Sequence, residues 1–67
     1  MKNYFIKLYV THYDSKGNVI GVEKEISHAM DYAEAYEFVN KFRAEKKVFE
    51  VMQEIEDNEV IEVTHKF

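Results

Sequence analysis

One stretch of the chain, residues 31–47, constrains the fold most, because it alone carries the period of a long helix. Its apolar residues recur every three or four positions and so share one helix face. Asp31 suits an N-cap, and Glu34 completes a capping-box pattern, while Ser27 is an alternative cap that would add one turn. We therefore expect a helix over about residues 31–46. The apolar stripe consists of Tyr32, Ala35, Tyr36, Phe38, Val39 and Phe42.

The residues on both sides of this helix alternate between apolar and polar positions, which is typical of strands. Two strands precede the helix and two follow it, so the chain predicts a ββαββ arrangement in one α+β domain. We expect a four-stranded antiparallel sheet in the order 2-1-3-4, with the helix packed on one face. The strands are expected over about residues 3–13, 18–26, 48–55 and 60–67 of the single domain 1–67.

The first turn, residues 14–18, has the composition of a three-residue hairpin loop that contains a glycine. This loop would set Val10 opposite Val22 on the face under the helix. On the other face it would set Lys7 opposite Glu25. Apolar residues then meet one another, and a base meets an acid.

Two residues of the second strand depart from its alternation. Lys24 would fall on the inner, apolar face, where a lysine discourages pairing at a sheet edge. Gly21, inside the strand, favours a local kink or bulge. We therefore expect this strand at the edge of the sheet.

The second turn contains Asp57 and Asn58. A two-residue turn would place the apolar residues of the last two strands on opposite faces of the sheet, whereas a loop over residues 57–59 brings them together. Because burial sets the register, we expect the three-residue loop. Glu54 would then lie opposite Glu62 on the outer face.

Composition and motifs indicate a non-enzymatic protein. The chain has no Cys, and its three histidines do not stand at metal-ligand spacing. It has no Gly-rich phosphate loop and no Ser beside an oriented base. We expect no catalytic residue, no cofactor and no bound metal. The N-terminus does not read as a signal peptide and no apolar run is long enough to span a membrane, so we expect a cytoplasmic protein with no membrane partner.

The charge is distributed unevenly along the chain. Residues 1–46 hold seven acids and seven bases, so the last 21 residues, with six acids and two bases, carry the whole net charge of −4. An acidic protein repels phosphate backbones, which counts against direct nucleic-acid binding. The acidic final hairpin instead favours a basic partner.

The outer face of the predicted sheet, opposite the helix, is the candidate binding surface. A single helix covers only one face, and the other should be mostly polar in a monomer. Here it is rich in tyrosine and aliphatic residues beside acids, which favours a protein-binding surface. The alternative is that cross-strand tyrosines only stabilise the sheet. The candidate partner-binding residues are Phe5, Tyr9, Tyr13, Val48, Glu50, Met52, Glu54, Glu56, Val60 and Glu62.

In size, charge and element order the chain is similar to small acidic phage-encoded inhibitors of host enzymes, including those that mimic DNA. This resemblance implies an inhibitor of a basic, nucleic-acid-processing protein. A second copy of the chain is another expected partner, since small domains gain stability from association. Two further hypotheses stay open. Phe5, Tyr9 and Tyr13 can stack single-stranded bases on a sheet face, and a dimer can form a small-molecule site.

Overall fold

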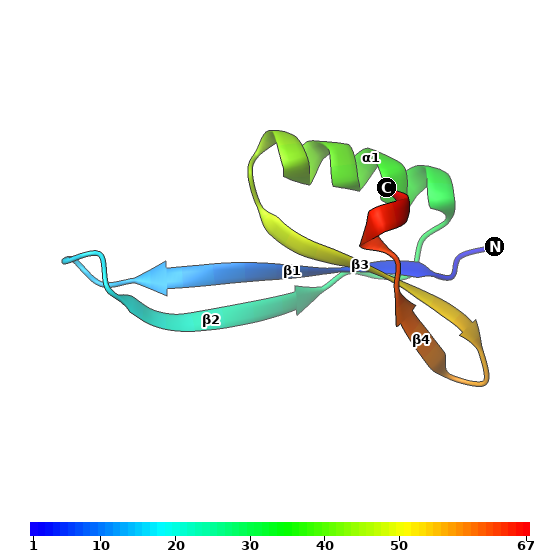
Figure 1. The fold of residues 1–67 in the computed structure, drawn as a ribbon, viewed down its shortest axis with the longest axis horizontal. Coiled ribbons are helices and arrows are strands. Elements are labelled where there is room, and N and C mark those ends of the chain that lie inside the picture. The colour runs from blue at the N-terminus through cyan, green and yellow to red at the C-terminus, as the bar shows by residue number, and fades with distance from the viewer.

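The computed structural model describes all of residues 1–67 and has the predicted ββαββ architecture (Figure 1). The sheet order is β2-β1-β3-β4, and every neighbouring pair is antiparallel, so the predicted fold class and strand order are confirmed. Helix α1 packs across one face of the sheet. The elements are β1 (Tyr4–Tyr13), β2 (Val19–Ile26), α1 (Tyr32–Ala44), β3 (Val48–Glu56), β4 (Glu59–Glu62) and a 3₁₀ turn, η1 (Thr64–Lys66).

The start of α1 follows the sequence prediction. Asp31 is the N-cap, and its Oδ1 accepts a hydrogen bond from the Glu34 amide at 2.9 Å. This bond satisfies one of the free amides of the first turn. Ser27 does not cap the helix. Its hydroxyl accepts the Ile6 amide at 2.8 Å and so ties the segment before α1 to β1.

The end of α1 comes two residues earlier than predicted. The Lys47 amide donates to the Phe42 carbonyl at 2.9 Å and the Lys46 amide to the Arg43 carbonyl at 3.1 Å. These two bonds form a Schellman motif, whose turning residue adopts the left-handed conformation. Here that residue is Lys46, with φ of 57°, rather than the usual glycine.

The core lies between α1 and the inner face of β1 and β3. Ile6 pairs with Val51 at its centre, and Val39 of the helix is fully buried above them. Tyr4 and Phe49 pack against this cluster from either end. The six buried residues are Ile6, Met30, Ala35, Val39, Val51 and Val63.

The fourth strand is shorter than predicted. β4 ends at Glu62, and the turn η1 carries Phe67 back towards the helix (Figure 1). The Thr64 hydroxyl accepts the Val51 amide at 2.8 Å, and the Phe67 ring stacks on Tyr32 at 4.8 Å between centroids. The C-terminal residues therefore close one end of the core instead of extending the sheet.

The predicted register of the first hairpin is wrong beyond its turn. Tyr13 pairs with Val19 as the loop geometry requires, but His12 pairs with Gly21. Ile20 is thus an extra residue in β2, which is the definition of a β-bulge. The predicted irregularity in this strand is present, and it lies next to the glycine.

This bulge exchanges the two faces of β2. Val10 lies opposite Glu23, where we expected Val22. Lys24, expected on the inner face, lies on the outer face together with Val22 and Ile26. A shift of one residue has this effect because strand side chains alternate between faces.

The second turn is also different from the prediction. Asp57 and Asn58 both have positive φ, 47° and 66°, and form a two-residue turn rather than the expected loop over residues 57–59. Positive φ at both positions defines a type I′ turn, which suits the twist of a hairpin.

A bulge in β3 offsets the effect of this shorter turn on which face of the sheet the side chains occupy. Glu54 pairs with Val60 and Glu56 with Glu59, so Ile55 is the extra residue. Phe49 and Val51 of β3 and Ile61 of β4 therefore share the inner face. Glu54 is not opposite Glu62, because the predicted register differs from the observed one by two residues.

The first hairpin extends beyond the rest of the molecule. β3 pairs with β1 only as far as Tyr9 and Val48, and neither the helix nor another strand accompanies the hairpin past that point (Figure 1). We call residues 10–23 the arm. The arm makes the molecule elongated, with extents of 45 × 26 × 19 Å.

Candidate protein-binding surface

The outer face of the sheet, the one that α1 does not cover, has contributions from all four strands. The alternation of side chains and the observed registers assign its members. They are Phe5, Lys7, Tyr9, Thr11 and Tyr13 of β1; Val19, Val22, Lys24 and Ile26 of β2; Val48, Glu50, Met52 and Glu54 of β3; and Val60 and Glu62 of β4.

Nine of the ten predicted partner-binding residues lie on this face, and Glu56 does not. The bulge at Ile55 turns Glu56 to the helix side of the sheet, opposite Glu59. The prediction missed Val22, Lys24 and Ile26, which the other bulge turns outward. Gly21 is the signal in the sequence that could have found them, since an interior glycine often marks a bulge.

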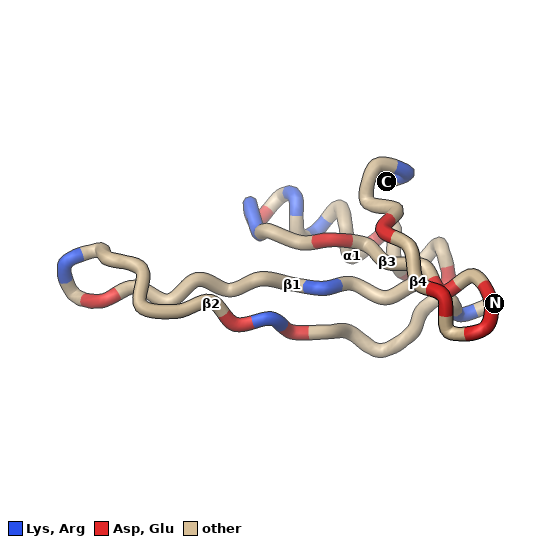
Figure 2. Tube along the Cα trace, turned by 60° about the horizontal axis from the view of Figure 1, so that its bottom comes forward, with Lys and Arg blue, Asp and Glu red and all other residues tan.

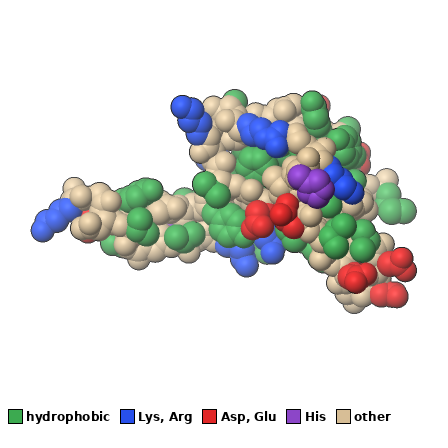
Figure 3. Space-filling model, in the orientation of Figure 1, with side chains coloured by type: hydrophobic (Ala, Val, Ile, Leu, Met, Phe, Trp, Pro, Cys, Tyr) green, Lys and Arg blue, Asp and Glu red, His purple; other side chains and the backbone are tan.

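The apolar residues of the outer face are exposed to an unusual degree. Five of them keep more than half of their surface accessible. These are Tyr13, Val19, Val22, Ile26 and Val48. Three belong to the arm, and the space-filling view shows patches of hydrophobic side chains on its surface (Figure 3). Such a grouping is typical of interaction surfaces.

The centre of the outer face is more closely packed than the arm. The Tyr9 hydroxyl donates a hydrogen bond to Glu50, and this bond raises the pKa of Tyr9, with desolvation and the nearby negative charge adding to the effect. Lys7 lies opposite both Ile26 and Glu50, rather than opposite Glu25 as predicted. The hydroxyl–carboxylate contact links Tyr9 of β1 to Glu50 of β3.

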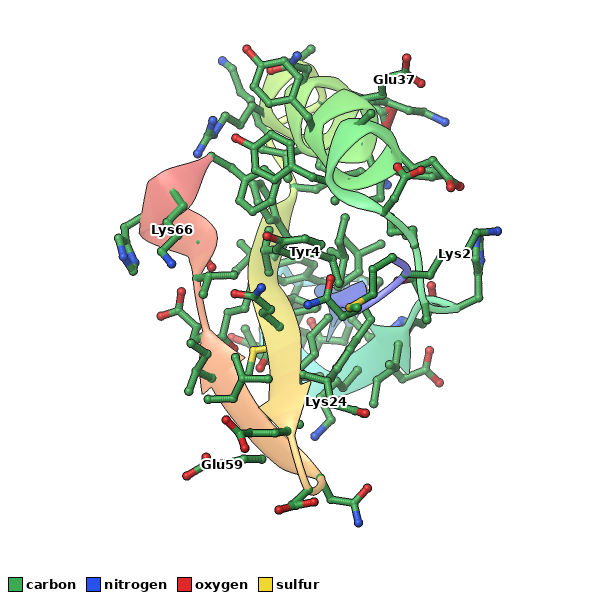
Figure 4. The ribbon with its side chains drawn as sticks, turned by 90° about the vertical axis from the view of Figure 1, so that its right-hand side faces the viewer. Lys2, Tyr4, Lys24, Glu37, Glu59 and Lys66 are labelled. Carbon is green, nitrogen blue, oxygen red and sulfur yellow. The ribbon has the colours of Figure 1, made fainter.

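Charges on the outer face are segregated by strand. The lysines, Lys7 and Lys24, lie on β1 and β2. The acids Glu50, Glu54 and Glu62 lie on β3 and β4. Figure 4 shows Lys24 on the side of the sheet away from the helix. Figure 2 shows acids near the β3–β4 end and also on β2, where Glu23 and Glu25 flank Lys24 in the sequence. On this face the lysines therefore lie on β1 and β2 and the glutamates on β3 and β4.

The acids of β3 and β4 continue into the tip of the second hairpin. Glu56, Asp57 and Glu59 are all exposed there, and no base accompanies them (Figures 2 and 3). Glu62 has a local role, because the hydroxyl and amide of Thr64 hold its pKa below the usual value. The remaining acids of the tip face solvent.

The structure offers little volume for a small molecule. It contains two shallow cavities of about 150 and 180 Å³, whereas ligand pockets usually measure about 300–1,000 Å³. The first lies between α1 and the inner face, and the second lies on the helix. Their lining residues are Ile6, Leu8, Glu25, Ile26, Ser27 and Phe42 for the first, and Glu37, Phe38 and Lys41 for the second.

The structure brings no group of three or more potential metal ligands together. His12 lies 3.3 Å from Glu23 across the inner face of the arm, and this pair has no third partner. Helix α1 is too short and too polar to cross a membrane. Comparisons with protein-family models, with curated proteins and with solved structures found no match to this chain.

Proposed function

We propose that this protein is a non-enzymatic interaction module that binds another protein chain through the outer face of its sheet. The observation that carries the proposal is the strip of half-exposed apolar side chains that runs from Tyr13 and Val22 on the arm to Val48. Removing such side chains from water is favourable by about 25 cal/mol per Å². A partner that covers the strip therefore gains binding energy without disturbing the core.

The overall dimensions support the same proposal. The accessible surface is 4987 Å², compared with about 4,450 Å² for a typical monomer of this mass. The radius of gyration is 13.7 Å, compared with about 11 Å for a typical compact domain of 67 residues. The arm, which extends beyond the rest of the molecule, contributes to both excesses.

The arm gives a second line of support. An isolated two-stranded hairpin is marginally stable in water. The arm, residues 10–23, has no third strand, and its outer face exposes Tyr13, Val19 and Val22. Contact with a partner would supply the missing layer. The arm is therefore best explained as a part of the molecule that is covered when the protein works.

The charge distribution supports a finer proposal about one class of partner. The segment from Glu54 to Glu62, both included, holds five acids and no base, so the tip of the second hairpin favours a protein with a basic surface. An enzyme that processes nucleic acid has such a surface. In this form the protein is an inhibitor similar to the small acidic phage-encoded ones, and it presents carboxylates where phosphates would lie.

Site-specific photo-crosslinking tests the main proposal. A photo-reactive phenylalanine analogue is placed at Val22 or Val48 on the outer face, or at the exposed Asn40 of α1 as a matched control, in cells that express the protein. We expect covalent protein adducts from the first two positions and none from the control. Equal adducts from all three positions, or none from any, would contradict the proposal. Mass spectrometry of the adducts identifies the chain that occupies the face.

One observation favours a second candidate function, single-stranded nucleic-acid binding. The bulge in β2 places Lys24 directly opposite Tyr9 on the outer face, so a base that stacks on the ring has a cation beside it. Three glutamates on the same face oppose this function. Binding of a labelled single-stranded oligonucleotide at moderate salt, lost in Tyr9→Ala, would favour the second candidate over the first.

A further inference from the structure

We propose that the free edge of β2, together with the cavity beside it under α1, binds an extended segment of another protein that carries a lysine or arginine. The segment pairs with β2 as a fifth strand and places its basic side chain in the cavity. The cavity lies on the helix side of the sheet. The site is therefore distinct from the outer face and does not depend on the proposed function.

One edge of β2 has no neighbouring strand. β2 stands at the end of the order β2-β1-β3-β4, and Figures 1 and 2 show no element on its other side. The Ser27 amide donates to the Ile6 carbonyl at 2.9 Å, which fixes the alternation of hydrogen bonds between β1 and β2. The backbone groups of Val22, Lys24 and Ile26 therefore point to the free edge. They offer a row of amides and carbonyls to another strand.

The features that often protect an edge strand leave this one open. An inward-pointing lysine discourages pairing, but Lys24 lies on the outer face. The bulge at Ile20 interrupts only one end of the strand, and residues 21–26 pair regularly with β1. Glu23 and Glu25 lie on the helix side of the edge. They select the charge of an incoming strand, because like charges directly opposite one another are unfavourable.

The cavity beside this edge has the size and the lining for one long side chain. Its volume is about 150 Å³, which is enough for a group about the size of benzene. Its apolar walls, which include Ile6 of β1 and Phe42 of α1, suit an aliphatic stem. The Ser27 hydroxyl is already occupied, because it accepts the Ile6 amide and donates to the His28 carbonyl at 3.0 Å. Glu25 is the one charged residue of the lining.

The charge of the occupant follows from Glu25. Its carboxylate takes part in neither of the two ion pairs of the chain. A lysine or arginine lays its aliphatic stem along apolar surface and keeps its charged end at a polar rim. In an antiparallel pair on the free edge, the position opposite Glu25 is one without hydrogen bonds, where facing side chains approach most closely. A base at that position fills the cavity with its stem and reaches the carboxylate with its charged end.

A second copy of the chain does not fit this edge. A symmetric antiparallel pairing centred on Lys24, the middle of the free edge, sets Lys24 opposite itself and Glu23 opposite Glu25. Like charges in these positions destabilise a strand pair. The occupant is therefore a foreign segment, in which bases on the helix side alternate with apolar or acidic residues on the outer side.

Selection from a phage-displayed library of short random peptides, on the purified protein, supplies the probe. We expect the enriched peptides to alternate lysine or arginine with apolar residues. Glu25→Lys should weaken their binding at least about 10-fold, because it sets two bases against each other. Glu25 is exposed, so this variant should keep the circular dichroism spectrum of the wild type. The matched control Glu59→Lys, in β4 at the opposite edge of the sheet, should bind the peptides like the wild type.

Strand pairing has its own test in the selected peptide. The amides of a strand point alternately to its two sides, so only every second one faces a given neighbour. N-methylation of every second residue should therefore abolish binding in one of the two phases and leave it nearly unchanged in the other. In the protein, the amides of Val22, Lys24 and Ile26 should become protected from hydrogen exchange when the peptide binds.

A selection that enriches no peptide, or only peptides without a base, would overturn the proposal. Equal weakening by Glu25→Lys and Glu59→Lys would place the peptide elsewhere, and equal effects of both N-methylation phases would exclude strand pairing. Protection of the same edge amides in the concentrated protein alone would make a second copy the occupant. If Val48 gives no crosslinked adduct while the peptide still binds at the edge, the proposed function fails and this proposal stands.

Discussion

Two valines of β3, three positions apart, should differ strongly in how much stability the same truncation costs. Val51 is 0 % exposed and lies at the centre of the core, whereas Val48 is 65 % exposed on the outer face. Val51→Ala removes about 1.6 kcal/mol of transfer free energy, at about 0.8 kcal/mol for each buried carbon lost. The cavity left behind adds about 1 kcal/mol. The expected loss of unfolding free energy is therefore about 2.5 kcal/mol.

A loss of this size is large for so small a domain, whose total stability is roughly 3–10 kcal/mol at 0.05–0.15 kcal/mol per residue. It should lower the midpoint of thermal unfolding by roughly 10–20 °C. Val48→Ala should change the unfolding free energy of the monomer by less than about 0.5 kcal/mol, because the side chain is already in water. Its effect should appear in association instead.

Urea unfolding followed by circular dichroism measures both variants, at a protein concentration where sedimentation shows only monomer. If Val48→Ala costs the monomer as much stability as Val51→Ala, the register of β3 against β1 and the assignment of the two faces are wrong.

Three further predictions concern local contacts. Asp31→Ala should lower the unfolding free energy by about 1 kcal/mol, because the Glu34 amide loses its acceptor, and Asp31→Asn should recover most of that loss in the same urea assay. Lys46→Gly should raise the unfolding free energy by about 0.5 kcal/mol, because a left-handed residue other than glycine is strained by about 1 kcal/mol and glycine returns part of that gain as chain entropy. Glu62, whose folded pKa lies below the usual 4.5, contributes stability that is fully present above that value and is lost as the pH falls through its folded pKa. Glu62→Gln should therefore flatten the acid limb of the stability–pH profile, and an unchanged limb would exclude this role.

Fold class, strand order and the start of α1 could be predicted because their signals are local and repeated. The helical period recurs at many positions, and the structure has the helix over Tyr32–Ala44, while the capping interaction between Asp31 and Glu34 spans only three residues. The sheet order followed from antiparallel pairing of two hairpins around one crossover. Agreement between independent local signals is what makes such predictions reliable.

The registers were missed, because each depends on one extra residue. The bulges at Ile20 and Ile55 change which face every following side chain occupies. Gly21 indicated an irregularity in β2 but not its effect on the register, and no glycine marks the bulge at Ile55. The end of α1 was missed for a related reason, since Lys46 takes a conformation usually marked by glycine. The short β4 depends on a tertiary contact, the Thr64 hydroxyl with the Val51 amide.

The candidate surface was predicted largely through β1 and β3, whose faces are set by the helix that they support. The prediction was incomplete on β2, where the bulge brings Val22, Lys24 and Ile26 outward. This correction makes the face more apolar at the arm and adds Lys24 to it. The bulge in β3 turns Glu56 away from this face, so the surface is less acidic than the sequence indicated.

Methyl-resolved NMR on the isolated protein, followed over a dilution series, tests most directly whether the outer face binds a protein chain. The chain provides matched probes, with Val22 and Val48 on the outer face and Val39 and Val51 in the core. We expect the outer-face methyl signals to shift with concentration while the core signals stay fixed. Core signals that shift while the outer-face signals do not would contradict a binding role for this face. If no signal moves on dilution, self-association is excluded, and the same spectra recorded with the crosslinked partner decide between binding and an idle surface.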